Sequence, residues 1–133
     1  MSRGTNPRRA NGSRRSKLLA RLRASGRPCW ICGHAFDPAE AYPSELSMVG
    51  DELTPVSRGG SPTDPRNVAP AHRCCNAWRS TKSVEVVEAF RALVAERFGG
   101  SSGPVDWCAK ARALARCSGA GRAQEPPKTT TKW

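Results

Sequence analysis

The sequence has few of the residues that build a large apolar core. Aromatic side chains make up 6% of the 133 residues and hydrophobic residues 38%, while 11 Pro and 12 Gly leave few places for long regular elements. No apolar run approaches the roughly 18 residues that span a bilayer, and no charged n-region followed by an apolar h-region opens the chain. These absences argue against membrane insertion and secretion, and predict a cytosolic protein of one small domain with tails.

A core of this size is marginal by itself, and small domains in that position commonly depend on disulfides or on a structural metal. The chain has six Cys. In the reducing cytosol these are poor candidates for disulfides, so metal binding is the better interpretation for at least some of them.

Acidic residues are missing from the first 28 positions, which carry nine Lys or Arg. Residues 29–82 hold five basic and six acidic side chains, so the positive charge belongs to an N-terminal arm. Such a block neutralises phosphates and releases their counterions, which makes nucleic acid the expected partner. The alternative is a solvated basic tail. Membrane-surface binding is disfavoured because only three Leu form an apolar stripe in residues 16–25.

Turn residues and hydrophobic periodicity divide the chain into segments. The predicted elements are disorder at 1–15, a short helix at 16–25, strands at 51–56 and 68–70, and helices from 73, at 83–98 and at 105–116. The predicted organisation is a basic arm and short helix at 1–28, a metal-stapled domain at 29–82, a helical extension at 83–118 and a disordered tail at 119–133.

Metal-ligand spacing is the strongest signal in the sequence. Cys29 and Cys32 have the two-residue gap that lets both thiolates of one tight turn face a single tetrahedral Zn²⁺, and His72 with Cys75 repeats the gap at a helix start. Together they predict a closed, structural zinc site that contributes folding free energy. Cys74 competes with Cys75 as the fourth ligand but has the wrong gap to His72. The alternative to a metal site is that these cysteines are ordinary buried thiols. Core packing is the default interpretation of the remaining pair, Cys108 and Cys117.

Three pieces of sequence carry a family resemblance: "RPCWICG", "DELTPVSRGGSPTDPRNVAPAHRCCN" and "RSTKS". In this order and spacing, residues 8–82 resemble the HNH endonucleases, especially the small zinc-stapled forms encoded by tailed phages of actinobacteria. The resemblance implies an α+β fold built on a ββα-metal (His-Me) finger with a structural zinc, flanked by short helices and basic or disordered tails. It also implies a metal-dependent DNA endonuclease that leaves 5′-phosphate and 3′-hydroxyl ends.

The resemblance also implies roles for individual residues. Asp51 and Asn76 align with the family's ligands of a catalytic Mg²⁺ or Mn²⁺, and the amide of Asn67 aligns with the group that ties the loop between the strands. Glu52 departs from the family, because most relatives have His there as the general base. A carboxylate is ionised at neutral pH and can accept a proton. Strand alternation sends adjacent side chains to opposite faces, so we prefer Asp51 as ligand and Glu52 as base, with Glu52 as a second ligand left open.

Basic residues outside the motif positions are the candidate DNA contacts. They are Arg14, Arg15, Lys17, Arg58, Arg73, Arg79 and Lys82. The implied partners are DNA and phage terminase or portal proteins, with the host cytoplasm as the location. Two other functions compete: a catalytically silent DNA-binding module, and a zinc-stapled structural or RNA-binding protein of ribosomal type.

Overall fold

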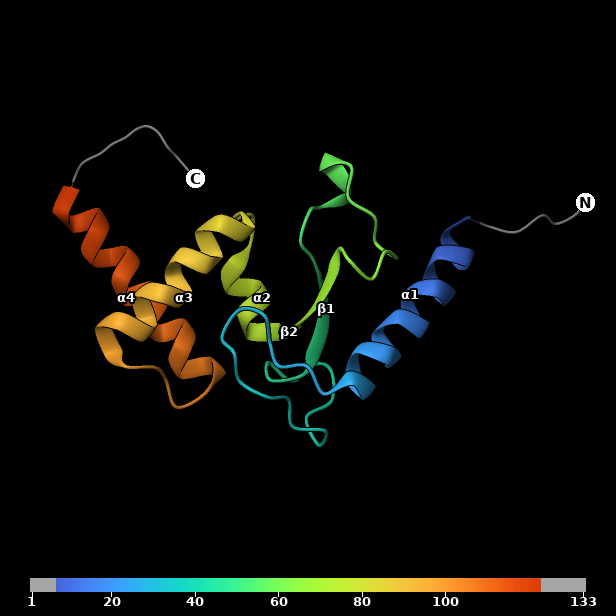
Figure 1. The fold of residues 1–133 in the computed structure, drawn as a ribbon, viewed down its shortest axis with the longest axis horizontal. Helices are drawn as coiled ribbons and strands as arrows, with labels where there is room; N and C mark the ends of the chain where they lie inside the picture. Colours follow the sequence, from blue (N-terminus) through green and yellow to red (C-terminus); the bar gives the residue numbers. More distant parts are fainter. Residues whose placement is uncertain (1–6, 123–133) are drawn as a thin grey trace, which may run out of the picture.

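The computed structural model describes residues 7–122, and side chains within residues 12–116. The elements in chain order are α1 (Pro7–Ser25), β1 (Met48–Glu52), the 3-10 helix η1 (Val56–Arg58), β2 (Val68–His72), α2 (Arg73–Arg79), α3 (Val84–Phe98) and α4 (Pro104–Arg122). This is a small α+β fold in which a two-stranded antiparallel sheet adjoins four helices. Figure 1 shows the strands between α1 on one side and α2, α3 and α4 on the other. Within the described part of the chain, no helix has the length and apolarity needed to cross a membrane.

Strand β1 lies earlier in the chain than the predicted strand at 51–56, so that prediction was wrong in its bounds. The ladder continues for one bond beyond β1, from the Leu53 N–H to the Asn67 carbonyl at 2.8 Å. It then ends because the Thr54 N–H donates to the Asn67 side chain instead, and Pro55 has no N–H to offer. Strand β2 begins at Val68 as expected but continues to His72.

Alternation along β1 sends successive side chains to different helices. Gly50 faces α1 closely: a Cβ at this position would lie 2.5 Å from Cδ2 of Leu19. Glu52 also faces α1, where it pairs with Arg15, whereas Asp51 faces α2 and pairs with Arg79. The sheet therefore presents one of its two adjacent carboxylates to each side.

Side chains and loops also bond to outward-facing carbonyls of both strands. In β1, the Gly50 carbonyl accepts a hydrogen bond from Arg15 at 2.9 Å and the Glu52 carbonyl accepts one from Arg79 at 2.9 Å. In β2, the Pro70 carbonyl accepts the backbone N–H of Trp30 at 3.0 Å. These bonds attach α1, α2 and the segment before β1 to the two strands.

Helix α1 is longer than predicted, because residues 7–15 are helical rather than disordered. Pro7 occupies the first helical position, where its missing N–H costs no bond. The helix is anchored at long range by Arg15, which donates to the carbonyls of Pro62 and Gly50 at 2.8 and 2.9 Å. Local sequence could not reveal these contacts.

Helices α2, α3 and α4 enclose the main core. Trp78 of α2 makes edge-to-face contacts with Phe90 of α3 and Trp107 of α4, at centroid distances of 5.2 and 4.9 Å. Helix α3 begins where the Ser83 hydroxyl accepts the Val86 N–H, and it ends at Gly99 in the left-handed conformation. Helix α4 continues to Arg122, beyond the predicted end at 116, and the rest of the expected disordered tail lies outside the described residues.

Candidate functional site

Four predicted metal ligands lie together. Cys29 and Cys32 belong to a turn before β1, His72 ends β2, and Cys75 lies in the first turn of α2. Their ligand atoms all lie within 4.8 Å of one another, and Cys32 Sγ is 3.4 Å from His72 Nδ1. The group could hold a metal such as zinc, for which three thiolates and one imidazole are a common tetrahedral set.

The backbone shapes this group. The Cys29 N–H donates to the His34 carbonyl and the Gly33 N–H donates to the Cys29 carbonyl, which closes the turn. Gly33 has φ +81°, a conformation that favours glycine. On the opposite side of the imidazole, His72 Nε2 lies 3.2 Å from the Ala35 carbonyl, so a proton on Nε2 leaves Nδ1 as the ligand atom.

The thiols of this group share protons unequally. Burial opposes ionisation of Cys29, but hydrogen bonds with Cys32, Cys75 and His72 outweigh it and lower the pKa of Cys29. The bond to Cys29 raises the pKa of Cys32 to about 12. Hydrogen bonds with Cys108, Cys29 and Cys32, followed by burial, raise the pKa of Cys75. Because thiols bind a metal ion as thiolates, metal binding at this group would release thiol protons.

Cys75, rather than Cys74, completes the four-residue group. Cys74 Sγ belongs instead to a second group, with Cys75 and Cys108, whose ligand atoms also lie within 4.8 Å of one another. Cys108 comes from α4, and sequence reasoning assigned it only to core packing. No spacing motif could have identified it, because 33 residues separate it from Cys75.

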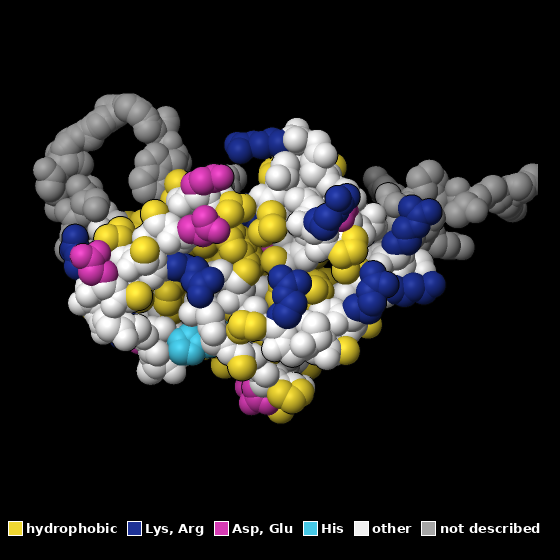
Figure 2. Space-filling view, in the orientation of Figure 1, with side chains coloured by type: hydrophobic (Ala, Val, Ile, Leu, Met, Phe, Trp, Pro, Cys, Tyr) yellow, Lys and Arg dark blue, Asp and Glu magenta, His cyan; other side chains and the backbone are white. Residues whose placement is uncertain are grey.

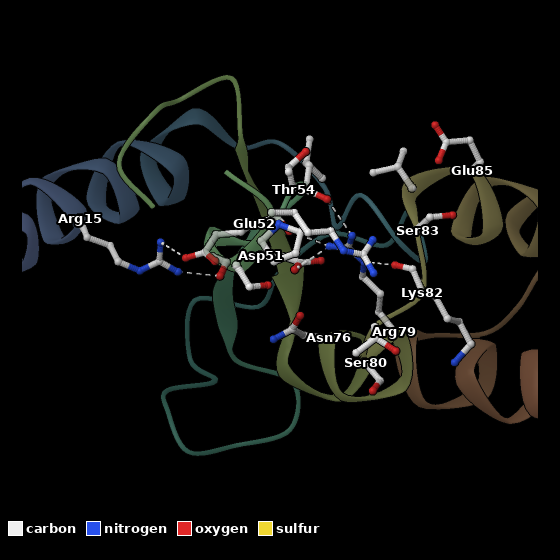
Figure 3. A pocket seen from close by; sticks show the side chains of 17 residues that line it. Arg15, Asp51, Glu52, Thr54, Asn76, Arg79, Ser80, Lys82, Ser83 and Glu85 are labelled. Carbon is white, nitrogen blue, oxygen red and sulfur yellow. Dashed lines mark hydrogen bonds and ion pairs between the residues drawn. The ribbon is translucent and has the colours of Figure 1, made fainter. Parts of the chain in front are cut away.

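A pocket of about 520 Å³ opens beside β1 and the C-terminal half of α2 (Figure 3). Asp51 and Glu52 line it from β1 and Asn76 lines it from α2. Arg58 and Lys82 line the same pocket. The pocket therefore brings together carboxylate and amide oxygens, which can bind a cation, and positive side chains, from segments that are distant in sequence.

Asp51 is buried, and each of its two carboxylate oxygens accepts a hydrogen bond from another side chain. Its Oδ1 accepts a hydrogen bond from Arg79 at 2.8 Å, and its Oδ2 accepts one from the Trp30 indole at 2.9 Å. Burial raises the pKa of Asp51, and the bonds from Arg79 and Trp30 act in the opposite direction. The Arg79 guanidinium supplies the countercharge that an ionised carboxylate needs at 7% exposure.

Glu52 lies on the other side of the strand and is more accessible. Its Oε2 is 3.3 Å from Arg15 Nη1, and the two side chains keep 26% and 29% of their surface exposed. An ion pair with this exposure contributes little stability and exchanges partners readily. Of the two adjacent carboxylates, Glu52 is therefore the one that can be released to act on another molecule.

Asn67 joins the two ends of the loop between the strands. Its amide oxygen accepts the Thr54 N–H at 2.8 Å, and its amide nitrogen donates to the carbonyls of Thr54 and Ser61 at 2.9 and 2.8 Å. Gly60 allows the loop to close here, because a Cβ at that position would collide with the Thr54 carbonyl. The bonds of Asn67 fix the chain that follows Glu52.

The predicted DNA-contacting residues have different surroundings. Arg14 and Lys17 are exposed on α1, and Arg58 is exposed at the pocket. Figure 2 shows Lys and Arg side chains gathered over the α1 end of the molecule. Arg15 is half-buried against Glu52. Exposed positive side chains of this set therefore lie both on α1 and at the pocket.

Like Arg15, three other residues of the predicted DNA-contacting set make contacts within the protein. Arg73 donates to the Pro43 carbonyl and remains exposed, while the Lys82 ammonium donates to the Trp78 carbonyl and lies over its ring. Arg79 differs most from the expectation of a surface phosphate contact, because its side chain is 6% exposed and its donors bond to Asp51 and to backbone carbonyls. Its role in the structure is to join α2 to β1.

Comparison of the chain with protein-family models, curated proteins and solved structures found no match.

Proposed function

We propose that the chain is a metal-dependent DNA endonuclease of the HNH type, with its active site in the pocket between β1 and α2. The observation that carries the proposal is the meeting of Asp51, Glu52 and Asn76 in one pocket beside basic side chains. Carboxylate and amide oxygens serve a hard cation and a general base, and positive groups serve the phosphates of a nucleic acid.

Zinc is the ion that we propose for Cys29, Cys32, His72 and Cys75, as the staple of a ββα-metal finger. Four protein ligands complete a tetrahedron, so this ion would have a structural role. Asn76 directly follows Cys75 in α2. Zinc at the four-residue group would therefore fix the helix that carries Asn76 against β2, which pairs with the strand that carries Asp51.

A catalytic cation fits the remaining donors of the pocket. Each oxygen of Asp51 accepts one hydrogen bond from the protein, and a carboxylate offers about four lone-pair sites. Asp51 therefore keeps capacity for a ligand bond. Asp51 and Asn76 would hold Mg²⁺ or Mn²⁺, with water supplying the other ligands. When bound, this ion would stabilise the charge that develops on the phosphate and on the leaving oxygen.

The side chains of the pocket would bind the phosphate and accept the proton. Arg15 pairs with Glu52 at 3.3 Å, and a DNA phosphate would compete for its guanidinium. Glu52 would then accept a proton from the attacking water. Arg58, exposed at the edge of the pocket, would hold the neighbouring phosphate, while Asn67 would keep the loop that follows Glu52 in position.

A catalytically silent DNA-binding module is the second candidate, and one observation favours it. Both carboxylates are paired with arginines within the protein, Asp51 with Arg79 and Glu52 with Arg15. If the Arg15–Glu52 pair persists on DNA, Glu52 is not free to accept a proton from water. The exposed basic residues of α1 would still bind phosphate.

Plasmid cleavage tests the first candidate against the second. The full chain, loaded with zinc, is incubated with supercoiled plasmid in Mg²⁺, in Mn²⁺ and in EDTA. We expect nicking with a divalent cation and a fall of about 10²–10⁴-fold in rate for Glu52→Gln, which keeps the shape but cannot accept the proton. Equal cleavage by the parent and by Glu52→Gln would exclude Glu52 as the base, and no cleavage with either cation would favour the silent module.

Glu52→His, which introduces the base that most HNH nucleases have at this position, is the second variant for this assay. Imidazole has an ordinary pKa of about 6.5, so cleavage should persist and the acid limb of its pH–rate profile should move to higher pH.

Asn76→Ala should weaken Mn²⁺ binding in calorimetry, whereas Glu52→Gln should leave it unchanged. If Asn76→Ala binds Mn²⁺ as tightly as the parent does, the ligand assignment is wrong.

A further inference from the structure

The second thiol group lies where α4 crosses α2. Its members are Cys74 and Cys75, adjacent on α2, and Cys108 on α4. Cys108 Sγ is 3.8 Å from Cys75 Sγ, and Cys108 is 2% exposed. Because Cys75 also belongs to the four-residue group, two sets of metal-ligand side chains share one sulfur atom.

The spacing of the three sulfur atoms suits a metal ion. Thiolates that bind one zinc ion lie about 2.3 Å from it, so they are roughly 4 Å from one another. The Cys75–Cys108 distance of 3.8 Å has this value, and all three sulfur atoms lie within the 4.8 Å limit of the group. A thiolate has more than one lone pair, so Cys75 can bind an ion on each side.

Core packing alone accounts poorly for this arrangement. A single S–H of Cys108 faces two acceptors at 3.8 Å, Cys75 Sγ and the Cys74 carbonyl, and can satisfy only one. Cys74 is only partly buried, so the group can be reached from solvent and an ion there can take a water as a further ligand. A packing role would be served equally well by an aliphatic side chain at position 108.

We propose that Cys74, Cys75 and Cys108 form a second metal site for a soft, thiolate-binding cation of the Zn²⁺ or Cu⁺ type, with Cys75 as a bridging thiolate. Soft thiolate ligands select these ions over Mg²⁺ or Ca²⁺. Binding releases the thiol protons of Cys74 and Cys108 to solvent. The site joins α4 to α2 beside the first metal group, and it does not depend on the proposed nuclease activity.

Metal stoichiometry tests the proposal. The full chain carries Cys117→Ser, so that the five described cysteines are the only thiols, and is titrated with Zn²⁺ or, anaerobically, with Cu⁺ added to the zinc-loaded protein. We expect native mass spectrometry to give about two metal ions per chain in at least one of the two titrations. Occupancy of the second site should also slow alkylation of Cys74 by iodoacetamide about tenfold or more, since a metal-bound thiolate is shielded from the reagent.

Two variants separate this site from the first. Cys108→Val keeps an apolar side chain in the core and Cys74→Ser keeps the size of a partly exposed one, so both should fold with one ion at the four-residue group. Each should lose the second ion, and in Cys108→Val the alkylation of Cys74 should no longer respond to metal. One ion per chain in both titrations of the parent, or two ions retained by Cys108→Val, would overturn the proposal.

Discussion

Among the residues whose side chains are described, twelve buried ones form one apolar cluster on the α2 side of the sheet, whereas a separate cluster on the α1 side contains three. The larger cluster includes Trp78, Phe90 and Trp107 together with three cysteines. The smaller one consists of Leu18, Leu22 and Val68. Buried apolar area stabilises a fold by about 25 cal/mol per Å², so most of the hydrophobic stabilisation lies on the α2 side.

Polar contacts make up much of the attachment on the α1 side. Arg15 alone bonds to the carbonyls of Pro62 and Gly50 and pairs with Glu52. Contact with water cannot replace a buried apolar contact. A phosphate, however, can replace the carbonyl or carboxylate group that a guanidinium binds. Hydrophobic stabilisation therefore lies mainly on the α2 side of the sheet, whereas the proposed phosphate binding would use the α1 side, so changes on the two sides should have different consequences.

Removing a ligand of the four-residue group should have the largest effect, on the α2 side. Cys29→Ser deletes one thiolate, and structural zinc contributes an apparent binding free energy of about 10–16 kcal/mol in zinc-finger peptides. This equals or exceeds the roughly 5–15 kcal/mol by which whole domains are stable. We expect Cys29→Ser to be unfolded by circular dichroism and to lack bound zinc.

Cys74→Ser is the control for that experiment, because Cys74 lies next to Cys75 but outside the four-residue group. It should fold and retain zinc at the first site. EDTA at high concentration should unfold the parent as Cys29→Ser does. A zinc-free parent with native secondary structure and cooperative unfolding would show that the apolar cluster suffices without the metal.

Breaking the buried ion pair should have the next largest effect. Arg79→Met keeps much of the side-chain volume but leaves Asp51 buried without its countercharge, a change that typically costs about 3–5 kcal/mol. Urea unfolding in excess zinc measures this loss in the free energy of unfolding. Arg73→Ala on the same helix is the control: the residue is exposed, and its loss should cost less than about 1 kcal/mol. Equal losses for the two variants would mean that the Asp51–Arg79 pair has no structural role.

Gly50→Ala tests the closeness of α1 and should have an intermediate effect. The new Cβ would lie 2.5 Å from Cδ2 of Leu19 and 3.0 Å from Cγ1 of Val68, so the Leu19 side chain, which attaches α1 to the strand, must move. Overpacking of this kind costs about 1–3 kcal/mol. We expect faster hydrogen exchange in α1 while the amides of α3 stay protected. The control, Gly12→Ala on α1, has open space around it and should stabilise the protein by up to about 1 kcal/mol.

Neutralising two exposed charges of α1 should have the smallest effect on stability. The double change Arg14→Gln and Lys17→Gln should alter the free energy of unfolding by less than about 0.5 kcal/mol. Under the proposed function it should reduce the slope of log K against log salt for DNA binding by about 2. Arg97→Gln, exposed on α3, is the matched control and should leave the slope unchanged. An unchanged slope in the double variant would mean that α1 does not contact phosphate.

Sequence predicted those parts of the molecule that depend on spacing along the chain. The two-residue gaps identified Cys29, Cys32, His72 and Cys75, because a tight turn and a helix start each fix two ligands locally. Turn residues likewise predicted the order of two strands followed by a helix. The bounds of β1 were missed because the side chain of Asn67 interrupts the ladder after Leu53, a contact between distant residues.

Long-range partners were the part that could not be predicted. Nothing in the local pattern indicates that Arg79 lies beneath β1 rather than on the surface, or that the Trp30 indole donates to Asp51. Cys108 lies beside the thiols of α2 only because α4 packs against α2. Each of these contacts depends on tertiary packing, which periodicity and composition do not specify.

The bonds to outward carbonyls of the two strands have a consequence for self-association. A two-stranded sheet consists only of edge strands, and unpaired edges are templates on which another chain can add a strand and begin aggregation. Here the outward carbonyls of β1 are already bonded, because Arg15 donates to the Gly50 carbonyl and Arg79 donates to the Glu52 carbonyl. In β2, the Pro70 carbonyl accepts the backbone N–H of Trp30. Pro70 itself has no N–H to donate. The same arginines that pair with the two carboxylates thereby also protect the sheet against polymerisation through its edges.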